Sequence, residues 1–492
     1  AEVVYQVEEG MRSFFGKTIV RGNTRTDTDR ITRLVTWDEG DAFSEQEVLT
    51  TQRNLTRTGV FRRVELSPMP ADPSTQVRPV EVEVREGRPL SLLYGIGYQY
   101  APDALENRSD PLGIAGVSYN NLFGAMRSAS IEVQYAPLSE RGRAVATFRE
   151  PFLFNRDIPL NVVAFFTREP IQEVDIERAG TVLESSRLFW RYLRVGLRYE
   201  YSRIEPVNPQ KLSTIEQEFS KFDQPIKQSA IGPNFFYDRR DDIIDPREGY
   251  YVTAATKYAF PFLQAEANYL KLSGQASGFR RFGRGVFAVS ARAGTIFNYG
   301  EEEEVPVPIA ERFFAGGRST NRGFDTDLVG IPGVTVDHDT KASLREEVEG
   351  AGSCADTYPD PELARYDCDT GPRIVGGNGF LGFNAEYRFP IIGNLGGTVF
   401  YDLAQVWKNP SDIRLAIEGE TGLRQGVGVG LWYMTPIGPL RLEYGWPIDA
   451  RSIPYNVTTV DENGDTVILV ERDPRDVRKE KGRLFFSIGY PF

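Results

Sequence analysis

The last nine residues of the chain, Leu484 to Phe492, alternate between two chemical characters. The even positions read Leu, Phe, Ile, Tyr and Phe, whereas the odd positions after Phe485 are Ser, Gly and Pro. Successive side chains of a strand point to opposite faces, so one face here is wholly apolar and largely aromatic. An exposed edge strand of this kind would promote aggregation in water. The pattern instead favours a lipid-facing strand, for which about nine to eleven residues suffice.

The same alternation begins at Leu90 and continues to the C-terminus. One face of the first strand is apolar, and further clear strands are predicted over 189–203, 248–260, 380–390 and 438–447. About sixteen strands are expected in total. Short connections (153–158, 240–248, 281–284, 390–394, 435–438) alternate with long ones (204–226, 300–375, 408–421, 449–482). Residues 89–492 are therefore predicted to form an all-β transmembrane barrel of antiparallel strands.

Residues 1–88 have a different texture, which predicts a small soluble α+β domain over 11–88. A strand and a turn at Gly22-Asn23 are expected within 12–26, followed by a helix within 27–37. Ser44 to Glu47 resemble a capping box that opens a second helix, which ends near Arg57. Two strands follow Gly59. Residues 1–10 resemble the last strand of a preceding module, so the chain is expected to be a mature or truncated form.

Composition excludes several other classes of protein. The formal charge of −12 argues against a nucleic-acid partner. A mean hydropathy of −0.36, without an apolar run of about 18 residues, argues against a helical membrane protein. The single histidine, His338, makes metal binding and histidine catalysis improbable. The 31 Phe and 23 Tyr suit the aromatic girdles of a membrane barrel, although on composition alone a large soluble all-β protein is equally favoured.

The longest connection, about 300–375, is far longer than an ordinary loop and is predicted to be functional. Strand alternation places Glu386, Asp402 and Glu443 on the lumenal side of the wall beside it. Carboxylates in a poorly hydrated lumen need counter-charges. We therefore infer that this loop folds inward and that Arg322 pairs with Glu386 and Asp402, because the guanidinium can hold a carboxylate with two hydrogen bonds. Ordinary hydrated lumen charges are the alternative.

The two cysteines, Cys354 and Cys368, lie close together in a polar part of the same loop. Too few histidines lie nearby for a zinc site. A disulfide that implies an oxidising compartment is expected. A pair of unpaired thiols in a loop is the alternative.

Several motifs resemble the outer-membrane insertase superfamily of BamA/TamA-like surface-antigen barrels. Arg322-Gly323-Phe324, preceded by RFFAGG, resembles the Arg-Gly-aromatic motif of the family's inward loop. FFYDRRDDIIDPREGYY, FNAEYRFPI, VFYDLAQVW and GVGVGLWYMTPIGPLRLEYGWPI resemble family strands and turns. Residues 11–88 resemble a polypeptide-transport-associated (POTRA) domain, including VRGNTRT and NLTRTGVF. The chain departs from the family pattern at Asn321 and Gln405.

The resemblance implies a role for each of these residues. Arg322 would anchor the loop, Glu386 and Asp402 would receive it, and Cys354 with Cys368 would staple its external part. The first and last strands would form a seam that opens to admit client strands. Glycine and proline weaken strand pairing, and the seam strands contain Gly95, Gly97, Gly489, Pro491 and the terminal Phe492.

The function implied is the assembly of barrel proteins in the bacterial outer membrane, with the POTRA domain in the periplasm and neither enzymatic activity nor a cofactor. The expected partners are unfolded barrel clients, periplasmic chaperones or accessory lipoproteins, and outer-membrane lipid. The cysteine pair and terminal phenylalanine favour a BamA-like over a TamA-like member, which would serve autotransporters or lipid-related transport. A two-partner secretion pore is a further alternative, although no plug helix is visible. A fused lipase is disfavoured because no Gly-x-Ser-x-Gly elbow occurs.

Overall fold

The computed structural model describes most of the chain. The described residues are 11–102, 107–138, 141–156, 158–171, 174–207, 225–299, 307–324, 326–327, 329–330, 376–417, 421–436, 438–448, 456–460, 466–471 and 482–489. The predicted preceding module, over residues 1–10, lies outside these ranges. The predicted disulfide between Cys354 and Cys368 does so too, as do the seam residues Pro491 and Phe492. Within the described residues, no helix combines the length and the apolar character that crossing a bilayer requires.

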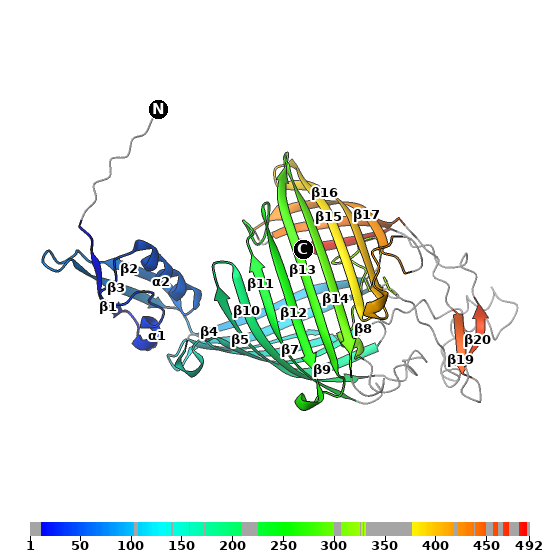
Figure 1. Cartoon of the computed structure of the whole chain (residues 1–492), viewed down its shortest axis with the longest axis horizontal. Coiled ribbons are helices and arrows are strands. Elements are labelled where there is room, and N and C mark those ends of the chain that lie inside the picture. The colour runs from blue at the N-terminus through cyan, green and yellow to red at the C-terminus, as the bar shows by residue number, and fades with distance from the viewer. Residues whose placement is uncertain are drawn as a thin grey trace. The chain divides into compact units, whose positions relative to one another are not determined.

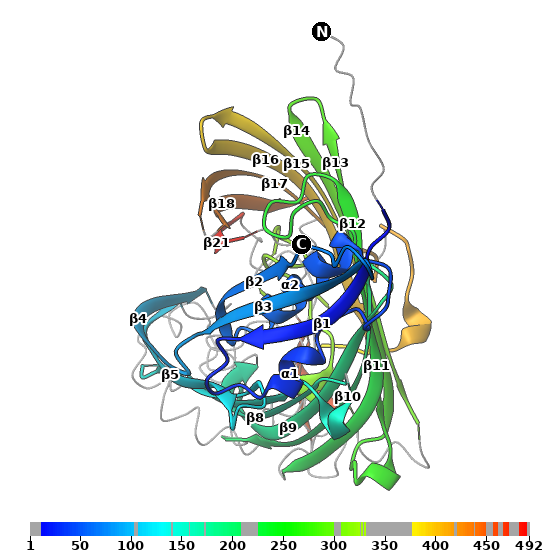
Figure 2. The same ribbon diagram turned by 90° about the vertical axis from the view of Figure 1, so that its left-hand side faces the viewer.

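The N-terminal domain contains a three-stranded sheet and two helices, in the predicted order strand, helix, helix, strand, strand (Figure 2). Its central strand β3 pairs in parallel with β1 and antiparallel with β2. The elements are β1 (Phe14–Arg21), α1 (Thr28–Thr32), α2 (Glu45–Arg57), β2 (Phe61–Pro68) and β3 (Val77–Glu86).

Two local predictions for this domain need correction. The helix expected within 27–37 is a single turn, because α1 ends at Thr32 and the chain then extends so that Trp37 stacks on Phe15 at 4.5 Å. Ser44 is the N-cap of α2, but its side chain makes no capping hydrogen bond, so the capping box does not form. In the first case tertiary packing overrides helical spacing, as it commonly does for short segments.

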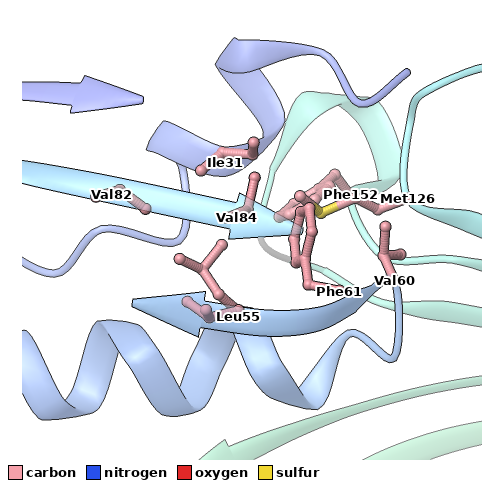
Figure 3. Packing of buried hydrophobic residues seen from close by; sticks show 9 residues of the cluster. Ile31, Leu55, Val60, Phe61, Val82, Val84, Met126 and Phe152 are labelled. Carbon is pink, nitrogen blue, oxygen red and sulfur yellow. The ribbon is translucent and has the colours of Figure 1, made fainter. Parts of the chain in front are cut away.

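The core of the N-terminal domain is completed by two residues from the turns of the larger sheet. Met126 and Phe152 lie beside Phe61 and Val84, and all four side chains are buried (Figure 3). Because Met126 and Phe152 are buried in this cluster, the two turns belong to the same packed unit as the small domain. Burial of each large apolar side chain stabilises the unit by roughly 2 kcal/mol. The amide of Asp27 also donates to the carbonyl of Gly124, over 3.0 Å.

The remainder of the chain forms a sixteen-stranded antiparallel sheet, as the alternation predicted, and strands β10 to β17 lie side by side in Figure 1. Its order follows the sequence, with β4 and β21 as its two end strands. The strands are β4 (Leu90–Pro102), β5 (Asn107–Leu122), β6 (Arg127–Ala136), β7 (Arg141–Glu150), β8 (Leu160–Ile171), β9 (Val174–Phe189), β10 (Leu193–Pro206), β11 (Ile226–Asp238), β12 (Gly249–Ala259), β13 (Tyr269–Phe282), β14 (Gly285–Asn298), β15 (Gly379–Ile392), β16 (Leu395–Trp407), β17 (Arg424–Thr435), β18 (Gly438–Pro447) and β21 (Arg483–Ile488).

Two features of the sheet differ from expectation. The strand predicted from residue 189 begins at Leu193, because Trp190 to Tyr192 form the turn between β9 and β10. The long connection after β18 contains an unpredicted two-stranded hairpin, β19 (Asn456–Val460) with β20 (Thr466–Glu471).

The expected alternation of faces is present in the last strand. Leu484 and Phe486 are 59% and 67% exposed, whereas Phe485 and Ser487 are buried. In β15, β16 and β18, likewise, the charged positions are buried and their apolar neighbours are more exposed. Since a strand has two faces, the apolar face meets lipid and the other face meets the lumen.

A carboxylate, Glu86, ties the turn after β1 to the end of β3. Its oxygens accept hydrogen bonds from the amides of Arg25 and Thr26, over 3.0 and 2.7 Å, and from the Thr26 hydroxyl over 2.7 Å. Asn121 in turn donates to the Thr26 hydroxyl over 2.8 Å. Partial burial would raise the pKa of Glu86, but the hydrogen bonds from Thr26 and Arg25 lower it from 4.5 to about 2.

We predict that Glu86→Gln destabilises the N-terminal domain by on the order of 2 kcal/mol at neutral pH, because charge-assisted hydrogen bonds are lost. The folded-state pKa is depressed, so the stabilisation by the carboxylate is complete above about pH 5 and is lost as the pH falls towards about 2. Parent and variant should therefore converge at low pH. Thermal unfolding of the N-terminal domain within the full chain, followed by circular dichroism between pH 2 and 7, measures the difference.

Glu83→Gln is the matched control, since this exposed residue lies on the same strand and should leave the unfolding temperature nearly unchanged. An equal effect of the two substitutions at every pH would contradict the role assigned to Glu86.

Candidate functional site

The loop between β14 and β15 lies against the inner wall of the sheet. Its described residues begin at Val307 and include a short 3₁₀ turn, Ile309–Glu311. Phe313 and Gly377 exchange backbone hydrogen bonds of 2.9 and 3.0 Å, and Val329 donates to Ala315 over 2.7 Å. These bonds hold the described residues of 307–330, which we call the strap, against the wall.

Arg322 is fully buried at the end of this strap. Its Nε and Nη2 donate to the two carboxylate oxygens of Asp402 over 2.8 and 2.9 Å, the two-bond geometry that a planar guanidinium favours. Its Nη1 donates to Glu386 and Glu443, each over 2.7 Å. The guanidinium also lies 3.5 Å from the ring centre of Phe400. The structure thus brings together the arginine and the carboxylates that the sequence pattern had placed in the lumen.

The carboxylates are shared with arginines of the wall itself. Arg441 Nη2 donates to Glu443 over 2.7 Å and lies 3.0 Å from Glu386, and Arg388 Nε donates to Glu386 over 2.5 Å. Three guanidiniums therefore face three carboxylates in this cluster. Because an uncompensated buried charge costs about 3–5 kcal/mol, the arginine of the loop offsets a large cost of burying these carboxylates.

Glycines let the backbone of the loop approach the wall closely. A Cβ at Gly445 would lie 2.0 Å from the Arg322 carbonyl oxygen, and a Cβ at Gly426 would lie 2.2 Å from Asn321 Oδ1. The same close approach constrains the loop residue Gly323, because a Cβ there would lie 2.8 Å from the Gly426 Cα of the wall. Gly323 is thus required by close approach, and this explains the glycine of the Arg-Gly-Phe motif in this chain.

The two departures from the family pattern have structural roles. Asn321 is buried, donates to the carbonyl of Arg424 over 2.9 Å and accepts from the amide of Gly323 over 3.0 Å. Gln405 donates to the carbonyl of Gly422 over 3.0 Å. Both side chains satisfy backbone groups that a smaller or apolar residue would leave unpaired.

The remaining residues singled out from the sequence are spread over the structure. Phe324 is buried in an apolar cluster with Ala315, Val329 and Phe380. Gly95 and Gly97 in β4 have nothing within 4 Å of an added Cβ, and Gly489 has a φ of +89° just after β21. The loop arginine site and these glycines are different regions of the molecule.

Sequence reasoning missed a second ionic cluster on the strap, around Glu311. This carboxylate is 1% exposed, and Arg178 and Lys257 lie 2.9 and 3.0 Å from it. Its partners belong to strands far away in the sequence, so no local motif marks them. The one sequence signal was an acidic residue between apolar ones, in PIAERFF.

The sheet, its inward strap and the small α+β domain together define an outer-membrane β-barrel with a periplasmic POTRA domain. Residues 121–491 match the family model described as Omp85 superfamily domain, and residues 14–87 match the POTRA model described as Surface antigen variable number repeat. The chain belongs to the Omp85 superfamily, as its motifs predicted, and its place is the bacterial outer membrane.

Similar proteins carry the name of an assembly factor. The outer membrane protein assembly factor BamA of Nitratidesulfovibrio vulgaris is 21% identical over 100% of this chain and 53% of its own length. BamA of Neorickettsia risticii is 24% identical over 90% of this chain and 53% of its own length. The chain therefore spans about half the length of these curated relatives.

A solved structure supports the fold. The crystal structure of BamA from Haemophilus ducreyi lacking POTRA domains 1–3 matches with a TM-score of 0.67 and 18% identity. The match covers 90% of this chain and 82% of that one.

We predict that Gly445→Ala loosens the strap, because the added methyl would overlap the Arg322 carbonyl. Trypsin should then cleave after Arg322, which is fully buried in the parent, whereas exposed Arg318 is cut in both proteins. Mass spectrometry of the tryptic fragments of the folded barrel measures the change.

Gly278→Ala is the control, since its Cβ would make only an ordinary contact of 3.7 Å with Val289. Full protection of Arg322 in Gly445→Ala would show that close backbone approach does not hold the strap.

Proposed function

We propose that this protein is a non-enzymatic assembly factor that folds β-barrel proteins into the outer membrane at a seam between its first and last strands. The observation that carries the proposal is the weak construction of the two end strands. In the described residues, β21 pairs with β18 along only Arg483–Ile488, whereas β15 and β16 pair along nearly their whole lengths. The BamA names of the relatives support the same function.

The first strand has the surface that an entering strand would need. Leu92, Tyr94 and Ile96 are 70%, 87% and 97% exposed, and no atom lies within 4 Å of a Cβ added at Gly95 or Gly97. Glycine lowers the stability of strand pairing, which eases exchange of one partner for another. An edge strand with free backbone groups is a template on which another strand can pair.

The physical need for such a template follows from the bilayer. A client strand that enters hydrocarbon alone leaves its backbone groups without hydrogen bonds, at several kcal/mol for each group. Pairing with β4 or β21 by β-augmentation would satisfy those groups while the client folds. No catalytic residue is required for this mechanism.

The other sites have supporting roles in the proposal. Arg322 anchors the strap, with Glu386 and Asp402 as its partners, and holds the wall next to the seam strand β21 in one arrangement. The POTRA domain would bind unfolded clients and periplasmic chaperones or accessory lipoproteins. Its sheet has β1 and β2 as end strands, so an extended segment could add to it.

We predict that a disulfide between the end strands blocks client folding. Cysteine pairs placed along Leu90–Ile96 and Leu484–Gly489, in a background with Cys354 and Cys368 replaced by serine, would be screened for crosslinking. A crosslinked pair should abolish folding of a barrel client into vesicles, and reduction should restore it. Gel mobility of the folded client measures the outcome.

A cysteine pair at Tyr433 and Leu440, which are partners within the β17–β18 ladder, is the matched control and should leave client folding unchanged. Full activity with a confirmed seam crosslink would exclude opening between the end strands.

We also predict that Arg322→Ala impairs assembly while the barrel still forms, because the substitution leaves buried carboxylates short of one counter-charge. Complementation of a strain depleted of its own assembly factor measures function, and heat-dependent gel mobility measures barrel formation. If the Arg322→Ala variant supported growth as well as the parent does, the Arg322 anchor would not be needed for assembly.

A further inference from the structure

Glu311 occupies a basic pocket on the inner wall of the sheet. Its carboxylate accepts hydrogen bonds from Arg178 of β9, over 2.9 Å, and from Lys257 of β12, over 3.0 and 3.1 Å. Lys271 of β13 donates to the Glu311 carbonyl over 2.6 Å. A carboxylate that is 1% exposed is thus held by cations from three strands.

The basic character of this pocket depends on a small number of carboxylates. Glu200 of β10 is hydrogen-bonded to Arg178 and, over 3.0 Å, to Arg198, and it lies 3.5 Å from Lys257. Arg198 also lies 3.8 Å from Glu184. Four cations therefore face three carboxylates in this part of the described chain. If Glu311 were removed, Arg178 and Lys257 would keep Glu200 as a partner, and four cations would face two carboxylates.

The second charged end of the strap lies eleven residues later, at Arg322, and has the opposite sign. Glu311 contacts β9, β12 and β13, whereas Arg322 contacts β15, β16 and β18. The strap therefore joins two arcs of the wall on either side of β14. The anionic end, Glu311, faces a basic arc, and the cationic end, Arg322, faces an acidic arc.

The segment between the two ends is fitted to the wall as well. Phe313 lies against Gly294 of β14, where a Cβ would be 2.3 Å from the ring, and its ring lies 5.9 Å from that of Phe380. The Lys271 ammonium lies 4.8 Å from the Phe313 ring centre. A lumenal cavity of about 540 Å³ borders this segment, with Arg194, Gln275 and Phe313 among its lining residues. The cavity thus lies directly beside the aromatic part of the strap.

We propose that Glu311 is a second anchor of the strap, and that the segment from Glu311 to Arg322 acts as a plug whose two ends mask lumen walls of opposite charge. Release of the Glu311 end uncovers a basic arc that favours anions, and release of the Arg322 end uncovers an acidic arc that favours cations. Glu311 acts through the position of the strap. This inference concerns the lumen and not the seam, so it holds whether or not the protein assembles clients.

Glu311→Gln tests the anchor with little change of shape. In planar bilayers with a KCl gradient, the variant should conduct severalfold more than the parent, and its chloride-to-potassium permeability ratio should rise severalfold. Arg322→Gln should also conduct more, but its permeability ratio should fall. Heat-dependent gel mobility confirms that each barrel is folded.

Glu205→Gln is the matched control, because Glu205 pairs with Arg203 on the same strand, β10, and both side chains are about half exposed. Its conductance and permeability ratio should equal those of the parent. Equal shifts in Glu205→Gln and Glu311→Gln would overturn the proposal, since any lost carboxylate would then have the same effect.

A double variant separates the charge of the wall from the position of the strap. Glu311→Gln combined with Lys257→Gln should keep the raised conductance, while the permeability ratio returns towards that of the parent. Lys257→Gln alone removes a partner from the wall side and should raise conductance without favouring chloride. The two-anchor plug would be overturned if Glu311→Gln and Lys257→Gln both conducted like the parent. It would also be overturned if the permeability ratio shifted in the same direction in Glu311→Gln and Arg322→Gln.

Discussion

The structure depends on charge neutrality in a poorly hydrated lumen. Strand alternation forces every second residue of β15, β16 and β18 inward, and three of those residues are carboxylates that two wall arginines cannot neutralise. A buried ion that lacks a partner costs several kcal/mol, far more than an exposed ion pair returns. The loop arginine removes that cost only if its backbone can reach the wall. The glycines at 426 and 445 therefore belong to the site as much as the charges do, because they leave the space that the strap fills.

Much of this arrangement could be predicted from the sequence, because it follows from a two-residue period. The alternation in β15, β16 and β18 fixed which of Glu386, Asp402 and Glu443 face inward, and the number of strands followed from counting segments between turns. Asn321, in contrast, looked like a departure from a motif. Its reason became visible only when the carbonyl of Arg424, about a hundred residues later, was found beside it.

What could not be predicted shares a physical cause, which is tertiary contact without a local pattern. Glu311 is defined by strands β9, β12 and β13, whose cations show no periodic relation to the loop. The first helix of the POTRA domain is shorter than its spacing suggests because Trp37 stacks on Phe15 in place of continuing the helix. Met126 and Phe152 belong by sequence to the barrel but by packing to the small domain. In each case burial against a distant element outweighs local propensity.

The strong and the weak interactions of the barrel lie in different strands. The wall from β9 to β18 is joined by long ladders and by a strap with an ionic anchor at each end, whereas the described residues of β21 form a short ladder and β4 presents glycines with open space around them. A barrel that must separate its end strands without collapsing needs rigidity elsewhere, because loss of one ladder otherwise lets the rest of the sheet relax. The strap provides that rigidity in a form that a sheet alone cannot, since its contacts run across strands and not between neighbours. If the end strands separate as proposed, anchoring of the strap and weakness at the seam are a single adaptation.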